Sequence, residues 1–185
     1  MKKQNKPLII IMGRSGTGKT SVANALHDAY GWIQIESYTT RPRRSKDETG
    51  HHFITETEFD RIQECDRFAY MEYCGYRYCT KREQLDQADL YVVTPDGYEM
   101  IKETYRDRPF FVIVLDASEA VLRERMRKRG GSTKEEIEER IRRDHVIFQD
   151  LHPDAIICTD QRSIEETGRM FFALTEAFLT DHARS

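Results

Sequence analysis

The sequence contains no long run of apolar residues. Runs such as Leu8–Met12 fall far short of the roughly 20 residues that a membrane-spanning helix needs. Leu8–Met12 follows a basic N-terminus, but it is also too short for the apolar region of a signal peptide, and glycine-rich sequence comes after it. We therefore expect a cytoplasmic protein that does not bind membranes.

The chain also lacks a large excess of either charge, since its 185 residues carry a net charge of −3. That balance gives no general reason to expect nucleic acid or an anionic surface as a partner. Basic residues do cluster locally, at 41–46 and 123–129, so local anion sites remain open. The four cysteines show no paired spacing typical of a zinc site, and we expect reduced, partly buried thiols.

Predicted strands alternate with predicted helices along most of the chain. Short apolar, β-branched runs indicate buried strands, and apolar residues at helical spacing indicate helices between them. This alternation predicts an α/β domain with a parallel sheet and helices on both faces. The predicted strands are 8–12, 32–35, 90–93, 110–115 and 155–158, and the predicted helices are 20–30, 98–105, 119–129, 134–148 and 164–179.

Residues 37–89 differ in character from the rest of the chain. They are rich in Tyr, Arg, His and Cys, and their apolar pattern is weaker. Short helices at 57–65 and 81–87, with strands at 68–73 and 76–79, indicate a small mixed α+β insert that faces a ligand. We therefore expect a core of residues 1–36 and 90–185, with a helical lid at about 130–148, and an acceptor-binding subdomain at 37–89.

The segment Gly13–Thr20 matches the phosphate-loop pattern G-x-x-x-x-G-K-[ST] at every position. A predicted buried strand precedes it and a predicted amphipathic helix follows, which is the context that such a loop requires. Lys19 would place a cation on the β- and γ-phosphates, and the Thr20 hydroxyl is the expected Mg²⁺ ligand. Backbone N–H groups and the start of the helix complete the predicted ATP site, formed by Gly13, Ser15, Gly16, Thr17, Gly18, Lys19 and Thr20.

The loop alone does not distinguish the classes of phosphate-loop protein. The chain lacks the Asn-Lys-x-Asp motif with which switch GTPases recognise guanine, and it is short for a large ATPase. A kinase that phosphorylates a small molecule fits the length best.

Further motifs follow the phosphate loop in order along the chain: Ser37–Arg44, Glu48–Gly50 with Phe53, Tyr76–Thr80, Arg125, Arg129-Gly130 and Arg140. The first reads Ser-Tyr-Thr-Thr-Arg-Pro-Arg-Arg, and Tyr76–Thr80 reads Tyr-Arg-Tyr-Cys-Thr. The set resembles the guanylate kinase family, whose segments read Ser-x-Thr-Thr-Arg-x-x-Arg and Asn-Tyr-Tyr-Gly-Ser/Thr. The resemblance covers nearly the whole chain.

This resemblance implies a phosphate-loop fold and an ATP-dependent nucleoside monophosphate kinase that converts ATP and GMP into ADP and GDP by in-line transfer. It implies ATP as co-substrate, Mg²⁺ as cofactor and small-molecule nucleotides as partners, in a monomer or homodimer. By resemblance, Arg129 lies beside the donor adenine and phosphates, and Arg140 neutralises the transferring phosphoryl group. The residues implied for the acceptor are Ser37, Arg41, Arg44, Tyr78 and Thr80, and those implied for catalysis are Lys19, Arg41, Arg129 and Arg140.

The acceptor half of the pattern contains several departures. Tyr70 stands where the family reads guanine with a glutamate, although Glu72 has the same strand parity and is expected to reach the same side. Other altered positions are His52 at a family tyrosine, Val92 and Thr94 at family aspartates, and Asp96 at a family glutamine. The acidic residue that organises the magnesium waters and the roles of His51 and His52 stay open.

Two alternatives to a GMP kinase remain. One is a phosphate-loop kinase of the same architecture with a different phosphorylated acceptor, which the altered acceptor positions favour. The other is a guanylate-kinase-like interaction module that does not catalyse a reaction, which the intact Gly18-Lys19-Thr20 disfavours.

Overall fold

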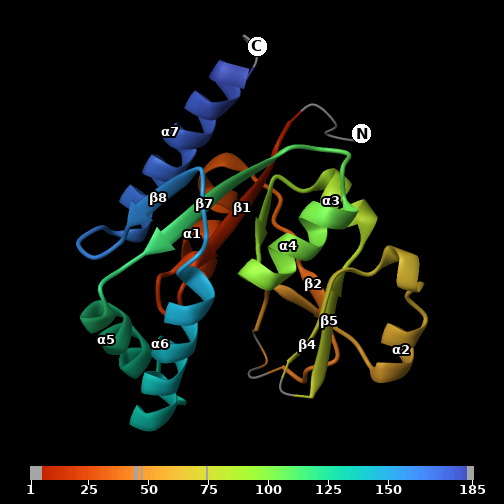
Figure 1. Ribbon diagram of the computed structural model, residues 1–185, viewed down its shortest axis with the longest axis horizontal. Coiled ribbons are helices and arrows are strands. Elements are labelled where there is room, and N and C mark those ends of the chain that lie inside the picture. The colour runs from red at the N-terminus through yellow and green to blue at the C-terminus, as the bar shows by residue number, and fades with distance from the viewer. Residues whose placement is uncertain (1–5, 44–45, 47, 74, 183–185) are drawn as a thin grey trace.

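A four-stranded parallel sheet forms the centre of the protein, with its strands in the order β6-β1-β7-β8. The structure is a computed structural model, and it describes residues 6–43, 46, 48–73 and 75–182. Figure 1 shows helices on both sides of this sheet. The strands are β1 (Leu8–Gly13), β6 (Leu90–Val92), β7 (Phe110–Asp116) and β8 (Ala155–Cys158).

The alternating side chains of β1 divide the apolar core into two layers. Ile9 and Ile11 are buried in one layer with α1 and α7, and Ile10 and Met12 are buried in the other layer with α3 and α4. Every residue of β1 is buried, as expected for a strand with neighbours on both edges and helices on both faces. The helices are α1 (Lys19–Tyr30), α3 (Arg82–Gln87), α4 (Pro95–Thr104) and α7 (Ile164–His182).

Within the predicted insert, a second sheet has strands in the order β3-β2-β5-β4. β2 and β3 pair in parallel, and the other two pairs are antiparallel. The short helix α2 covers one face, where Phe59 is fully buried against Cys79 and Tyr70. The elements are β2 (Ser37–Thr39), β3 (His51–Phe53), α2 (Glu56–Asp60), a 3₁₀ turn (Glu64–Asp66), β4 (Phe68–Tyr73) and β5 (Tyr76–Thr80).

The helices α5 (Glu119–Arg129) and α6 (Lys134–Phe148) form a pair with a small apolar core of their own. The predicted start of α6 is confirmed: Glu136 N donates to Thr133 Oγ1 at 3.2 Å, and Thr133 N donates to Glu136 Oε2 at 2.9 Å. In Figure 1 this helix pair and the second sheet lie on opposite sides of the view.

The predicted strand 32–35 is wrong. Within it only Gln34 forms a bridge, to Leu90 of β6. The Asp89 side chain accepts the N–H of Ile33 at 2.8 Å, which ends regular pairing at this edge, and Trp32 packs against the aromatic rings of α7. The strands β2 and β3 were not predicted, because three-residue strands with polar side chains give little periodic signal.

The helix predictions differ from the structure mainly at their ends. The predicted helix 57–65 is divided into α2 and the 3₁₀ turn, and α4 begins at Pro95 instead of Tyr98. Thr94 caps α4 by accepting the N–H of Gly97 at 3.2 Å, with Pro95 in the first turn. None of the helices in the described residues has the length and apolar character required to cross a membrane.

Arg108 joins three segments of the core through backbone carbonyls. Its side chain is buried, with 4% exposed, just before β7. Nε donates to Lys6 O at 2.8 Å and Nη2 to Pro7 O at 2.9 Å, while Nη1 donates to Leu85 O and Ala88 O at 2.8 and 2.9 Å. The guanidinium therefore fixes the start of β1 to the end of α3.

Replacing Arg108 with Ala leaves these buried carbonyls without their donor, and we expect a loss of about 3–5 kcal/mol in the free energy of unfolding. Arg108→Lys should recover only part of it, because one ammonium cannot reproduce the planar set of donors. Urea unfolding measures both effects. The control is Arg82→Ala, which removes an exposed arginine paired with Asp107 and should cost no more than about 1 kcal/mol. If Arg108→Ala loses as little free energy of unfolding as the control does, Arg108 does not hold these segments together.

Candidate active site

The carboxyl edge of the parallel sheet gathers the candidate site. β1 ends at Gly13, and the chain then turns through the phosphate loop into α1. The segments that follow β7 and β8 meet the loop there: Thr159 Oγ1 donates to Thr17 O at 3.4 Å and to Asp116 O at 3.1 Å. Ligands of open α/β sheets bind outside this edge.

Two glycines explain the path of the phosphate loop. At Gly13, with φ of 156°, a Cβ would lie 2.4 Å from Leu115 O on the neighbouring strand. At Gly16, with φ of 91°, a Cβ would lie 3.2 Å from Leu122 O of α5. A side chain at either position would push the loop away from β7 or α5, so close packing as well as backbone conformation requires glycine at Gly13, which belongs to the phosphate-loop pattern, and at Gly16, which does not.

Lys19 folds back over the loop. Its Nζ donates to Gly13 O at 2.7 Å and to Arg14 O at 3.2 Å. Burial lowers the pKa of Lys19 to about 8, the negative charge of Asp144 acts in the opposite direction, and Arg129 lowers the pKa further. A partly desolvated cation in this position strongly favours a bound anion.

The loop already holds an anionic group from its own chain. The Oδ2 atom of Asp144, on α6, accepts the backbone N–H of Ser15 at 2.6 Å. The Asp144 side chain is buried, and its charge also acts on Lys19. A backbone N–H of the phosphate loop is thus paired with a carboxylate of the same chain.

A cavity of about 600 Å³ opens beside the loop. Its wall includes most of the predicted ATP site, namely Ser15, Gly16, Thr17, Gly18, Lys19 and Thr20, and also Arg125, Arg129, Thr159 and Arg162. The Thr20 side chain is exposed at the start of α1. The Thr17 side chain instead turns inward, and its Oγ1 donates to Arg14 O at 2.8 Å. Gly13 lies behind the loop, at the end of β1.

The arginines of the helix pair occupy different positions. Arg125 is fixed to Thr159, with Nη1 to Oγ1 at 2.9 Å and Nη2 to the carbonyl at 2.6 Å. Arg129 lines the cavity at the end of α5. Arg140 is half-buried on α6, one turn before Asp144, and residues so spaced share a helix face. Arg140 therefore lies on the side of α6 from which Asp144 reaches the loop.

Arg41 is a buried cation in the predicted acceptor segment, with 8% of its surface exposed. It forms two bonds with the Glu48 carboxylate, at 2.7 and 3.2 Å, and its guanidinium lies 5.3 Å from the centre of the Phe53 ring. The Glu48 contact raises the pKa of Arg41. Arg44, also predicted for the acceptor, lies outside the described residues.

The remaining acceptor residues contribute hydroxyls. The Tyr78 ring meets the His51 ring edge-on at 5.9 Å between centres. Ser37 Oγ lies 3.3 Å from the hydroxyl of Tyr91, and Thr80 is fully buried. The Thr80 hydroxyl also donates to Gln84 Oε1 at 3.0 Å, and the contact of Ser37 with Tyr91 joins the second sheet to the central sheet.

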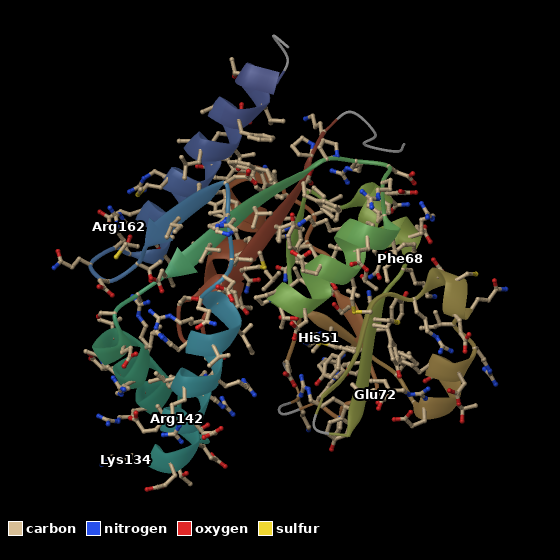
Figure 2. The ribbon with its side chains drawn as sticks, viewed as in Figure 1. His51, Phe68, Glu72, Lys134, Arg142 and Arg162 are labelled. Atoms are coloured by element: carbon tan, nitrogen blue, oxygen red, sulfur yellow. The ribbon has the colours of Figure 1, made fainter. Side chains whose placement is uncertain are left out.

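Tyr70 and Glu72 share one side of β4, as their parity predicts, but they do not join this group. Phe68 pairs with Thr80, but Met71 and not Tyr70 pairs with Tyr78, so β4 has one extra residue. This bulge includes Ala69, whose φ is 47°. Tyr70 consequently packs toward α2, and Glu72 lies opposite Arg77 and accepts the Tyr70 hydroxyl. Figure 2 shows Glu72 far along β4 from Phe68.

The bulge also changes which residue approaches α4. A Cβ at Gly97 would lie 3.7 Å from the Cβ of Ala69, so an apolar residue of β4 faces the first turn of that helix. Nearby, Thr94 serves as the cap of α4. His52 packs against Tyr38 with tilted rings whose centres lie 4.8 Å apart, on the face of the sheet that α2 covers. The altered positions thus include residues with structural partners of their own.

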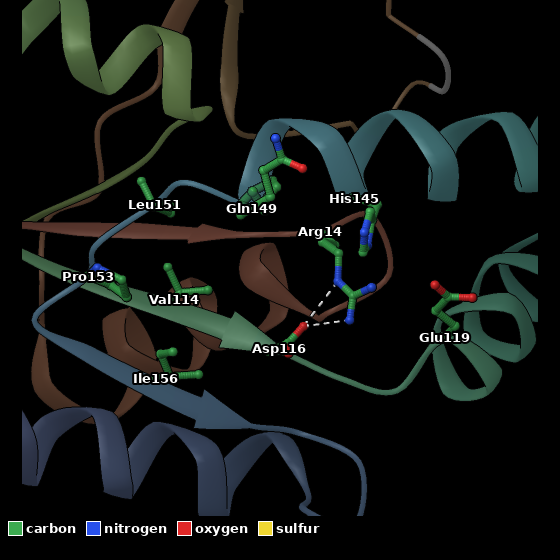
Figure 3. Close-up of a pocket in the computed structure, with 10 residues that line it drawn as sticks. Arg14, Val114, Asp116, Glu119, His145, Gln149, Leu151, Pro153 and Ile156 are labelled. Carbon is green, nitrogen blue, oxygen red and sulfur yellow. Dashed lines mark hydrogen bonds and ion pairs between the residues drawn. The ribbon is translucent and has the colours of Figure 1, made fainter.

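A second cavity, of about 440 Å³, lies on the other side of the loop. Arg14 donates to Asp116 Oδ1 through Nε and Nη2, at 3.1 and 2.8 Å, and forms its polar end (Figure 3). His145 lies beside this pair, and Val114 and Ile156 line the apolar end. Arg14, Asp116 and Asp144 were not predicted, although one signal existed: Asp144 follows Ile137 and Ile141 at helical spacing and therefore lies on a buried face.

Comparisons with known proteins find guanylate kinases. The family profile described as guanylate kinase matches residues 4–173. The guanylate kinase of Syntrophus aciditrophicus (strain SB) is 33% identical over 168 residues, which cover 80% of this chain and 81% of that protein. The guanylate kinase of Clostridium tetani (strain Massachusetts / E88) is 32% identical over 139 residues, which cover 70% of this chain and 66% of that protein.

Solved structures also resemble this chain. A crystal structure of guanylate kinase from Anaplasma phagocytophilum has a TM-score of 0.64 at 22% identity, over 96% of this chain and 88% of that one. An unliganded sugar kinase structure from Janibacter sp. HTCC2649 has a TM-score of 0.53 at 17% identity, over 91% and 93% of the two chains. These likenesses concern the fold, and the predicted class, a parallel sheet flanked by helices with a mixed insert, is confirmed.

The low pKa of Lys19 makes stability depend on pH. Between about 8 and the usual 10.5, the unfolded chain carries a proton on Lys19 that the folded protein has lost. The free energy of unfolding should therefore rise with pH in this window through Lys19. Lys19→Met removes the titrating group, so urea unfolding should show the wild type gaining stability relative to Lys19→Met between these pH values. A difference that does not change with pH would contradict the burial of this cation.

Proposed function

Because this chain belongs to the guanylate kinase family, we propose that it transfers the terminal phosphoryl group of ATP to GMP, giving ADP and GDP. One observation supports this most directly: the phosphate loop is a formed anion site, with the Ser15 N–H bonded to a carboxylate and Lys19 beside it. Family membership implies ATP as co-substrate. The non-catalytic alternative gains no support from such a loop.

In this proposal the donor occupies the cavity of about 600 Å³. Its phosphates bind the backbone N–H groups and Lys19, and Arg129 lies beside its adenine and phosphates. Arg140, one helical turn from Asp144, neutralises the phosphoryl group in transfer. Residues 130–148, which include α6, act as a lid over the donor, and residues 37–89 bind the acceptor.

Thr20 fits a role in Mg²⁺ binding. Its side chain is exposed on the wall of the cavity, next to Lys19. Among the described residues, no group of three or more His, Cys, Asp or Glu side chains is arranged to bind a metal. We therefore expect the Thr20 hydroxyl and the phosphates of the nucleotide to ligate Mg²⁺, which would reduce the negative charge on those phosphates.

At the acceptor, Arg41 is the residue proposed to bind the phosphate of GMP, together with Arg44 and the Tyr78 hydroxyl. The Glu48 carboxylate now occupies the planar fork of Arg41, and a phosphate has the same geometric complementarity to it. The attacking phosphate oxygen is already anionic at neutral pH, so alignment and charge neutralisation suffice and no general base is required.

A different phosphorylated acceptor is the second candidate, and the bulge in β4 favours it. The bulge turns Tyr70 and Glu72 away from Tyr78, and Val92 and Thr94 replace the family aspartates, so the acceptor face has hydroxyls where a carboxylate would bind guanine. A site that loses such a hydrogen-bonding group loses much of its selectivity between bases.

A coupled assay with ATP, Mg²⁺ and a panel of nucleoside and sugar monophosphates tests the proposal. Turnover with GMP as the preferred acceptor, at the highest kcat/KM, is the expected result. If the enzyme prefers another monophosphate, that compound, and not GMP, is its acceptor. No turnover of any member, by a protein that binds ATP, would contradict the proposal.

The Arg41→Ala variant tests the acceptor assignment. We expect KM for the acceptor to rise about 30-fold or more, because losing one partner of a close charge pair costs at least about 2 kcal/mol, while ATP binding stays nearly unchanged. Arg43→Ala is the matched control, since Arg43 lies two residues away but is exposed. Equal effects of both variants would indicate a general attraction of anions by a basic loop. An equal loss of affinity for ATP in Arg41→Ala would show that Arg41 does not act on the acceptor alone.

A further inference from the structure

Asp144 is a carboxylate that accepts a backbone N–H of the phosphate loop, a donor that a bound phosphate would use. We propose that Asp144 is an internal competitor for the phosphate loop, which donor nucleotides must displace, and that it sets how strongly the site prefers them by their number of phosphates. This inference rests on the proposed function, because it concerns the same donor site.

The contacts of Asp144 are those that a phosphate group would need. Its Oδ2 atom accepts the Ser15 N–H at 2.6 Å, and its charge acts on Lys19. The Nη2 atom of Arg143 lies 3.6 Å from its other oxygen. With 6% of its surface exposed, Asp144 depends on these partners, because a buried carboxylate without them would be strongly destabilising.

A bound polyphosphate and the Asp144 carboxylate cannot share these donors. Two anionic groups at hydrogen-bonding distance from the same N–H repel each other by several kcal/mol in a partly desolvated site. The donor must therefore move the carboxylate away from the loop. The repulsion grows with the charge of the nucleotide, so ATP is affected more than ADP, and ADP more than AMP.

The surroundings of α6 allow such a movement. His145, the next residue, and Gln149 line the cavity of about 440 Å³ between the end of α6 and the sheet (Figure 3). The carboxyl-terminal part of the helix is therefore not fully packed on that side. Because Arg140 is on the same helix, displacement of Asp144 by a donor would also move the residue proposed to act on the transferring phosphoryl group.

A role as a ligand for magnesium waters is the main alternative for this carboxylate, and it predicts the opposite effect. In that case a neutral residue at 144 would weaken the binding of ATP in the presence of Mg²⁺ and lower kcat. The displacement model instead predicts that a neutral residue at 144 tightens the binding of ATP, with or without Mg²⁺. In that model the carboxylate does nothing for ATP except compete with its phosphates.

The experiment measures dissociation constants of ATP, ADP and AMP for the wild type and Asp144→Asn by calorimetry, each with and without Mg²⁺. Asparagine keeps an oxygen that can accept the Ser15 N–H but removes the charge. We expect ATP to bind at least about tenfold more tightly, ADP to gain less, and AMP to change little. The matched control is Glu139→Gln, which removes one negative charge from an exposed position of the same helix, where Glu139 pairs with Arg142, and should change none of the constants.

Unchanged or weaker binding of ATP by Asp144→Asn would overturn the inference, as would an equal gain in Glu139→Gln. Asp144→Ala, measured with a thermal melt beside it, provides a second folded variant and should show the same order of gains. A wild type that binds no ATP would instead contradict the proposed function itself, so the two failures are distinguishable.

Discussion

The N–H of Ser15 in the phosphate loop is paired with a buried carboxylate, and the candidate site is arranged around this contact. Gly13 and Gly16 permit the loop to curl against β7 and α5, where side chains would clash with Leu115 O and Leu122 O. Curling directs the N–H of Ser15 outward and brings Lys19 over the loop. Such donors are costly to leave unpaired away from water, and in this protein a carboxylate pairs with one of them.

The same solution occurs at both proposed phosphate positions. Asp144 bonds to the phosphate loop, and Glu48 bonds to Arg41. These carboxylates stabilise charges that would otherwise be buried alone, and each occupies donors suited to a phosphate. In the proposed reaction, the phosphates of the two substrates displace these two carboxylates, which come from α6 and from the segment around Glu48, both outside the central sheet.

Features determined by neighbouring residues were predictable from the sequence. The buried strand β1, the phosphate loop and the capping box at Thr133 each depend on a few adjacent positions, and each was predicted. Features that depend on packing between distant segments were not. The bulge at Ala69 arises where β4 meets α4, and it reversed the side on which Glu72 was expected. The contact of Asp144 with Ser15 joins residues 129 positions apart, which no local pattern reports.

If substrate phosphates take the places of Asp144 and Glu48, a bound two-substrate mimic should show both exchanges. The experiment is a crystal structure of the protein with a mimic that joins ADP and GMP through their phosphates. We expect a phosphate oxygen on Ser15 N in place of Asp144, and the acceptor phosphate on Arg41 in place of Glu48. A structure with the mimic bound while both carboxylates keep their present partners would contradict the account.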